Sequence, residues 1–222
     1  MSPTCARLPI VVLISGGGTN LQAIIDASRA DLPVDIQAVI SNRPGAYGLE
    51  RARQAGIPTD VLDHRQFDSR EAFDQALMER IDALAPRLVV LAGFMRVLTP
   101  KLVHHYAGRM LNIHPSLLPK FRGLNTHARA LEAGEREHGV TVHFVTPDLD
   151  AGPVVIQARV PVRADDTPEA LAARVLEHEH RIYPEAIRWF AEGRLTLNGG
   201  VACLDGAPIT ALPERAEHLA GD

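Results

Sequence analysis

Asn112 and His114 are the residues whose types and spacing point most directly to chemistry. They are positions i and i+2 of RMLNIH (109–114), an apolar run typical of a buried strand, so their side chains share a face about 6.5–7 Å apart along the chain. Pro115 ends the strand, because proline cannot donate to a central ladder. An asparagine amide can donate to an oxyanion, and a histidine can transfer a proton near neutral pH. The spacing alone equally allows a hydrogen-bonded strand end without catalysis.

A carboxylate next to His114 would stabilise the charged imidazole and orient its ring. Asp148 and Asp150, in PDLDAG (147–152), are both candidates. Ser116 follows closely but lacks the G-x-S-x-G frame of a nucleophile elbow. We therefore expect direct transfer between two bound substrates, without a covalent enzyme intermediate.

The segment SGGGTN (15–20) stands between a predicted buried strand and a predicted helix. Such glycine-rich turns at a helix start bind anions through free N–H groups. The segment is neither G-x-G-x-x-G nor a P-loop, and the second strand ends in Ser41, Asn42 and Arg43 instead of an acid for a ribose. These features favour a phosphate monoester over NAD; a plain tight turn is the alternative.

The elements that must position these residues alternate along the first half of the chain. Apolar runs predict strands at 9–14, 34–41, 59–63, 87–94 and 109–114, and helical patterns occupy 21–28, 48–56, 68–84 and a short stretch from Thr99. Asp68 and Glu71 form a capping-box pattern at the third helix. This alternation predicts an α/β fold with a doubly wound, mostly parallel sheet and a Rossmann-like N-terminal half.

The second half of the chain has a different pattern. Residues 139–146 alternate with period two, and with 153–162 they predict an antiparallel hairpin around the 147–152 turn. A long helix from Asp166 or Thr167 follows, and then a short hairpin and a polar tail. No linker is visible, so we expect a single domain.

Composition restricts the class of protein. The chain has 222 residues, 46% hydrophobic and 23% charged, which is typical of a globular domain. A net charge of −4 with interspersed signs argues against a broad nucleic-acid surface. Cys5 and Cys203 are too isolated for a disulfide framework, which favours the cytoplasm. The apolar run at 9–14 is too short to cross a membrane, and no signal peptide is visible.

The chain contains ten histidines, but their spacing does not suggest a metal site. His178 and His180 lie at i and i+2 of a predicted helix and do not share a face, and neither H-E-x-x-H nor C-x-x-C occurs. We expect no metal. Glu179 lies on a stripe with Leu176 and Tyr183. Such a carboxylate suits ribose hydroxyls, although the residues alone favour a solvated helix edge.

The chain resembles the phosphoribosylglycinamide formyltransferases of purine synthesis over nearly all of residues 8–205. The resemblance lies in VVLISGGGTNLQAII, SNRPGAYGLERARQAGIPT, VVLAGFMRVLTP, LNIHPSLLPKFRGLNTHARALEAG and HGVTVHFVTPDLDAGPVVIQ. HPSLLP together with the last segment is specific to folate-dependent formyl carriers. The resemblance implies formyl transfer from the co-substrate 10-formyltetrahydrofolate to the amine of 5-phosphoribosylglycinamide.

The resemblance also implies roles for individual residues. The catalytic trio falls on Asn112, His114 and Asp150. The acceptor substrate falls on the loop residues Gly17, Gly18, Thr19, Asn20 and Leu21, with Glu179 at the ribose. The folate falls on Arg70, Met95, Arg96, Val97, Leu98, Asn112, Val145, Thr146, Pro147, Asp148, Leu149 and Asp150. Asn125 departs from the family, which often has histidine or aspartate at this position.

The implied organisation is one formyltransferase domain over 1–222. It comprises a nucleotide- and phosphate-binding half (8–110), a folate and catalytic half (111–205) and a tail (206–222). We expect a monomer or weak homodimer that binds small molecules and neither nucleic acid nor membrane. Related tRNA formyltransferases carry a basic C-terminal domain and formyltetrahydrofolate hydrolases an N-terminal regulatory domain, so length and charge disfavour both. The hydrolase and a non-catalytic folate- or phosphate-binding module are the alternatives.

Overall fold

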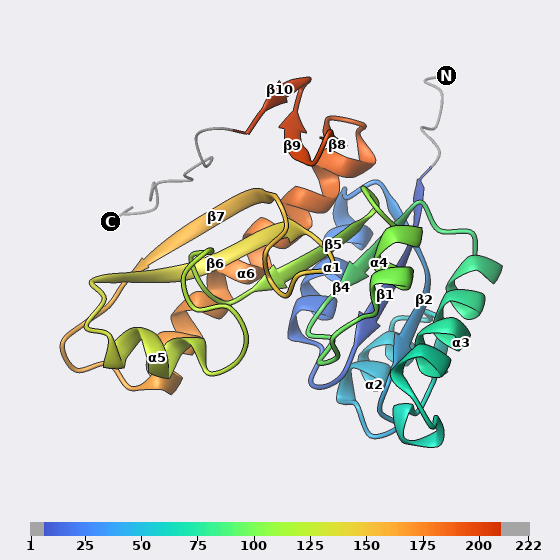
Figure 1. Cartoon of the computed structure of the whole chain (residues 1–222), viewed down its shortest axis with the longest axis horizontal. Coiled ribbons are helices and arrows are strands. Elements are labelled where there is room, and N and C mark those ends of the chain that lie inside the picture. The colour runs from blue at the N-terminus through green and yellow to red at the C-terminus, as the bar shows by residue number, and fades with distance from the viewer. Residues whose placement is uncertain (1–6, 210–222) are drawn as a thin grey trace.

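A seven-stranded sheet forms the centre of the molecule (Figure 1). The structure is a computed structural model that describes residues 7–209. The strand order is β3-β2-β1-β4-β5-β6-β7, with β1 to β5 parallel and β6 and β7 antiparallel to their neighbours. The strands are β1 (Leu8–Ile14), β2 (Val34–Ser41), β3 (Thr59–Val61), β4 (Leu88–Leu91), β5 (Met110–His114), β6 (Glu137–Phe144) and β7 (Val154–Pro161).

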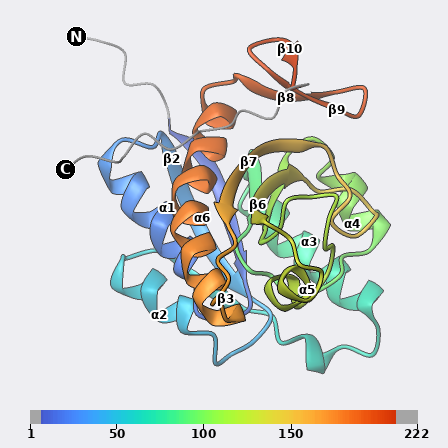
Figure 2. The same cartoon turned by 90° about the vertical axis from the view of Figure 1, so that its left-hand side faces the viewer.

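Helices cover both faces of this sheet. One face packs against α1 (Thr19–Ala30), α2 (Tyr47–Gln54) and α6 (Pro168–Ala191), and the other against α3 (Arg70–Ala83) and α4 (Pro100–His105). Figure 2 shows α1 and α6 side by side. A short helix, α5 (Thr126–Glu132), contacts α6, and a 3₁₀ turn, η1 (His64–Gln66), follows β3.

The apolar run of β1 explains this layering. Successive strand residues point to opposite faces, so a strand buried on both sides must be apolar throughout. Ile10, Val12 and Ile14 belong to the core beneath α1, α2 and α6. Val11 and Leu13 belong to the core beneath α3 and α4. The predicted doubly wound, mostly parallel sheet with an antiparallel C-terminal hairpin and a long helix is therefore confirmed.

The order of the strands places a crevice at one edge of the sheet. The chain runs from β1 outward to β2 and β3, then returns to the other side of β1 with β4. The loops after β1 and β4 diverge at this switch point, which is where open α/β sheets bind ligands. A hydrogen bond from Ser15 N to Gly93 O (3.1 Å) joins the two loops just beyond the strand ends.

Several boundaries differ from those predicted. Helix α3 is capped by Ser69, whose side chain accepts a hydrogen bond from Ala72 N (3.0 Å); Asp68 lies one residue too early for the expected capping box. Strand β4 ends at Leu91 instead of residue 94, because Gly93 takes a left-handed φ of 76° and turns the chain. Helix α5 was not predicted, since it has only seven residues and two buried side chains.

The C-terminal part forms a small antiparallel sheet, as predicted for a short hairpin. Its strands are β8 (Leu195–Asn198), β9 (Val201–Leu204) and β10 (Ala207–Pro208). Strand β10 pairs with β9. Most of the expected tail (206–222), namely residues 210–222, lies outside the described part of the chain, as does Cys5. Within residues 7–209 no helix has the length and apolar character that a membrane span requires.

Candidate active site

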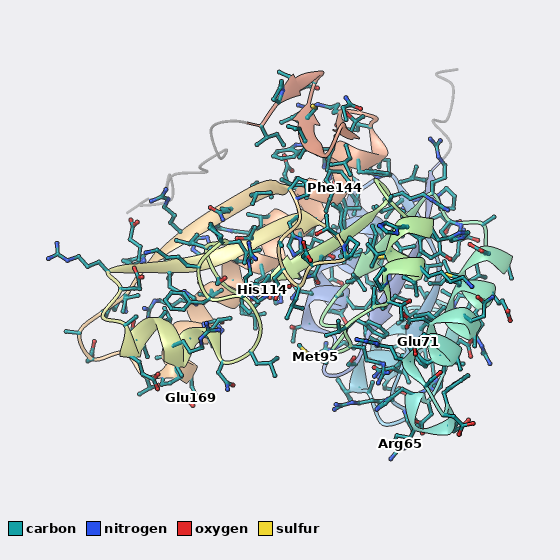
Figure 3. The ribbon with its side chains drawn as sticks, in the orientation of Figure 1. Arg65, Glu71, Met95, His114, Phe144 and Glu169 are labelled. Carbon is teal, nitrogen blue, oxygen red and sulfur yellow. The ribbon has the colours of Figure 1, made fainter. Side chains whose placement is uncertain are left out.

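Asn112, His114 and Asp150 meet at the carboxyl end of β5. His114 Nδ1 lies 3.4 Å from Asp150 Oδ2, and both side chains are almost buried, with exposed fractions of 7% and 10%. Figure 3 shows His114 in the middle of the molecule. Asp150 has a left-handed φ of 47°, a conformation that costs energy outside glycine and that often occurs at functional sites. Of the two aspartates proposed from the sequence, Asp150 is thus the one beside His114.

Backbone groups of the following loop complete the surroundings of His114 and Asp150. His114 Nε2 lies 2.9 Å from the carbonyl oxygen of Phe121, and Gly123 N donates to Asp150 Oδ2 over 2.9 Å. Each of the two ring nitrogens of His114 therefore faces an oxygen atom, one of the Asp150 carboxyl group and one of a main-chain carbonyl. The segment KFRG (120–123), which had no predicted role, therefore supplies the main-chain groups that hold His114 and Asp150.

His143, on the neighbouring strand, was not predicted as a site residue. It is the direct cross-strand partner of Asn112, and its Nε2 lies 3.1 Å from Asn112 Nδ2. Its Nδ1 lies 2.8 Å from the carbonyl oxygen of Phe144, which can only accept. Nδ1 must then carry the proton, and Nε2 accepts from the Asn112 amide. Burial lowers the pKa of His143, in agreement with this neutral form.

A buried polar network fixes the loop between β5 and α5. Thr141 Oγ1 donates to Ser116 O (2.6 Å) and accepts from Leu118 N (3.1 Å). Gln157 on β7 donates to Leu118 O and to Thr141 Oγ1, each over 2.9 Å. The loop is thereby tied to β6 and β7, so the Phe121 carbonyl reaches His114 from a fixed backbone.

The predicted anion loop precedes α1. Gly18 takes a left-handed φ of 70°, and the first hydrogen bond of the helix runs from Gln22 N to Gly18 O (2.9 Å). The preceding N–H groups have no acceptor within the helix and are therefore available to an anion. A cavity of about 650 Å³ opens beside the loop. It is lined by residues 15–17, 43–47, His64 and Arg65.

Glu179 lies on the face of α6 next to this loop. Its carboxylate accepts a hydrogen bond of 2.6 Å from Asn20 Nδ2, and only 9% of the residue is exposed. The interpretation of Glu179 as a solvated helix edge was therefore wrong, because α1 covers it. Burial raises its pKa, and the Asn20 hydrogen bond opposes that rise. Tyr183, one turn further along α6, donates to the carbonyls of Leu91, the last residue of β4, and Leu111 in β5, and so ties this face of the helix to both strands.

A cleft next to Asn112, His114 and Asp150 contains most of the residues predicted to bind folate. It is lined by Arg96, Val97, Leu98, Asn112, Val145, Thr146, Pro147, Asp148, Leu149 and Asp150, together with Leu91, Phe94, Val103 and His143. Met95 and Arg70 do not line it. Met95 N donates to Ser15 Oγ (2.7 Å), and its side chain is 61% exposed on the loop after β4 (Figure 3). Arg70 is the exposed first residue of α3.

Among residues 7–209, the histidines form no group that could hold a metal ion. In the part of the chain that the structure describes, no three His, Cys, Asp or Glu side chains are placed to hold one ion. The site thus offers side-chain acid–base groups, main-chain donors for an anion and a cleft, all at one edge of the sheet. This arrangement suits group transfer between a phosphorylated substrate and a second ligand.

Comparisons with known proteins agree with this chemistry. The chain is 60% identical over 198 residues to phosphoribosylglycinamide formyltransferase of Escherichia coli K12. The aligned region covers 89% of this chain and 93% of that protein. The structure of phosphoribosylglycinamide formyltransferase from Coxiella burnetii superposes with a TM-score of 0.88 at 60% identity, covering 91% and 95% of the two chains. A formyltetrahydrofolate deformylase from Burkholderia mallei is more distant, with 30% identity, a TM-score of 0.82 and coverage of 90% and 70%. Residues 8–187 match the Formyl transferase family model, and the chain therefore belongs to the formyl transferase family.

Proposed function

We propose that this protein transfers the formyl group of 10-formyltetrahydrofolate to the amine of 5-phosphoribosylglycinamide, a step of purine synthesis. The observation that carries the proposal is the position of the Asn112–His114–Asp150 trio. Asn112 and Asp150 line the folate cleft, while Tyr183 connects β5 to the helix that carries Glu179. A donor in the cleft and an acceptor on the glycine loop would therefore present their reacting atoms to the same residues.

In this mechanism the folate lies in the cleft lined by residues 96–98 and 145–150. The acceptor phosphate lies on the N–H groups of residues 17–21, and Glu179 accepts hydrogen bonds from the ribose hydroxyls. Both substrates are held before any bond changes, which removes much of the entropic cost of a bimolecular reaction.

The neutral amine of the acceptor attacks the formyl carbon, and the formyl oxygen becomes an oxyanion. Asn112 donates to that oxygen from Nδ2, whose other contact is His143 Nε2. The imidazolium of His114 stabilises the same charge, and Asp150 holds the ring beside it. Preorganised donors of this kind stabilise the tetrahedral intermediate without reorganisation during the reaction.

Collapse of the intermediate breaks the bond between the formyl carbon and N10 of the folate. The proton lost by the attacking amine is delivered to N10, either by His114 or through an ordered water. His114 Nε2 donates to Phe121 O in this conformation, so direct donation requires that this hydrogen bond be exchanged for one to the substrate. The steps need neither a covalent enzyme intermediate nor a metal.

The test is a spectrophotometric assay of deformylated folate, run with and without 5-phosphoribosylglycinamide. Product that forms only with the acceptor supports formyl transfer. His114→Ala should lower kcat by roughly 10²–10⁴, the range for a lost general acid or oxyanion donor. A His114→Ala enzyme with near-normal turnover would contradict the assigned role.

The likeness to the deformylase makes hydrolysis of 10-formyltetrahydrofolate the second candidate. Water would then replace the amine as the nucleophile, and the same trio would serve it. Folate product at equal rates with and without the acceptor would favour this activity. Tight folate binding with no product in either case would favour a binding module.

We further propose a cytoplasmic location, which the buried free thiol of Cys203 supports.

A further inference from the structure

Helix α2 donates hydrogen bonds to two successive carbonyl groups of the glycine loop. Gly48 N, in the first turn of α2, donates to Gly16 O over 3.0 Å. Arg51 Nε, one turn later, donates to Gly17 O over 2.8 Å. In a trans peptide the C=O and the following N–H point in opposite directions. Fixing both carbonyls against α2 therefore turns the N–H groups of Gly17 and Gly18 away from α2, as successive donors of an anion-binding nest.

Arg51 is itself held in place on both sides. Its guanidinium stacks 5.0 Å over the ring of Tyr47, and its Nη1 donates to Gln22 Oε1 on α1 (3.3 Å). Arg51 thus connects α2, the loop and the first turn of α1. The backbones are in close contact here, since a Cβ on Gly18 would lie 2.6 Å from Gly48 Cα. The loop geometry is consequently coupled to the position of α2.

His180, on α6, lies close enough to Arg51 for the two groups to interact electrostatically. The Nε2 atom of His180 is buried without a hydrogen-bond partner. Burial, and next the charge of Arg51, lower the pKa of His180. A buried ring nitrogen next to Arg51 therefore still has hydrogen-bonding capacity that a bound ligand can use.

We propose that Arg51 is a positioning residue for the phosphate of the acceptor substrate. It orients the Gly17–Gly18 peptide so that the N–H groups face the phosphate, and it adds a fixed positive charge behind the loop. This inference rests on the proposed function in naming the acceptor, but the phosphate-binding role of Arg51 can be tested without it.

The experiment compares Arg51→Gln with Arg53→Gln in the full chain. Arg53 is the matched control because it lies on the same helix, its side chain is half exposed and it pairs with Glu50 at 3.6 Å. Arg51→Gln should raise KM for 5-phosphoribosylglycinamide about 10- to 100-fold, as expected for a lost charged hydrogen bond. The KM for 10-formyltetrahydrofolate and kcat at saturating acceptor should stay within about twofold, as should every constant of Arg53→Gln. Arg51→Lys, which keeps the charge but not the planar fork, should recover part of the loss.

An acceptor that lacks the 5-phosphate distinguishes the proposed phosphate-positioning role of Arg51 from a purely structural role. With this riboside, kcat/KM of Arg51→Gln should equal that of the wild type, because the lost interaction is with the phosphate. An equal loss on both acceptors would overturn the proposal.

Titration with inorganic phosphate gives a readout that is independent of formyl transfer. Arg51→Gln should bind phosphate at least about tenfold more weakly than the wild type and Arg53→Gln. If the wild type transfers no formyl group but this difference is found, the proposed function fails and the role of Arg51 stands. Equal phosphate affinity in all three proteins would overturn the role of Arg51.

Discussion

His143 Nε2 lies 3.1 Å from Asn112 Nδ2, while Nδ1 of the same ring lies 2.8 Å from Phe144 O. The second contact fixes the proton on Nδ1, so the first makes Nδ2 of Asn112 the donor toward His143. The amide has a second N–H on the same nitrogen, and its orientation is determined by the first. In the proposed mechanism, His143 therefore orients the amide that donates to the oxyanion.

We predict that His143→Leu lowers kcat by about 10²-fold, because a misplaced catalytic group typically costs that much. The KM for the acceptor should change little, since the glycine loop does not contact His143. Steady-state kinetics with each substrate varied in turn measure kcat and the two KM values separately. His104→Leu, an exposed histidine on α4, is the control for loss of an imidazole. A normal kcat in His143→Leu would show that Asn112 keeps its orientation by other means.

Asp150→Asn should reduce kcat by roughly 10²–10⁴, since an amide beside His114 no longer compensates the charge of the imidazolium. The residues act as a unit, so the double variant His114→Ala/Asp150→Asn should be no worse than His114→Ala alone. The double-mutant cycle is measured from the single-turnover rates of the wild type, the two single variants and the double variant. Strictly multiplicative losses would mean that Asp150 acts on the substrate and not through His114.

The sequence was sufficient where a local pattern determines the structure. The continuous apolar run of β1 requires burial on both faces, and Pro115 determines the end of β5. These patterns predicted the doubly wound, mostly parallel sheet and the shared face of Asn112 and His114. They did not identify Asp150 over Asp148, because the choice depends on the conformation of the turn.

The remaining parts of the site depend on long-range packing or on groups common to every residue. Phe121 and Gly123 act through the main chain, so no side chain indicates their role. His143 could have been noticed as a histidine in a strand leading to the Asp150 turn, but its pairing with Asn112 requires the strand register. Glu179 is buried by Asn20, which is 159 residues away along the chain.

Glu179→Gln should raise KM for 5-phosphoribosylglycinamide about 10- to 100-fold, because hydrogen bonds from ribose hydroxyls to a charged acceptor are lost. The variant remains nearly isosteric, and the amide oxygen can still accept from Asn20 Nδ2. Kinetics with varied acceptor and saturating folate measure the effect, with Glu177→Gln, an exposed glutamate on α6, as the control. An unchanged acceptor KM would remove Glu179 from the ribose site.

Gly152→Ala should destabilise the fold by about 1–3 kcal/mol, the usual cost of overpacking. A Cβ at this position would lie 1.7 Å from Phe144 O, the same carbonyl that accepts from His143. The turn carrying Asp150 must shift, so kcat should fall as well. Urea unfolding and kcat are measured together. Gly45→Ala, where a Cβ would meet nothing within 4 Å, should leave stability nearly unchanged; equal stability of both variants would contradict the clash.

The acid sensitivity of the fold should depend on His138. Its ring is buried against His127, with ring centroids 5.1 Å apart, and burial is the main cause that lowers its pKa from 6.5 to about 4. Between these values the unfolded chain binds a proton that the native protein does not, so stability falls as the pH decreases from 6.5 toward 4. The free energy of unfolding should fall by about 2 kcal/mol between pH 7.5 and pH 5 for this reason alone.

His138→Phe should therefore lose less stability than the wild type over this interval in urea unfolding. His104→Phe, on the exposed side of α4, is the control and should match the wild type. Parallel pH profiles for the wild type and His138→Phe would contradict this assignment.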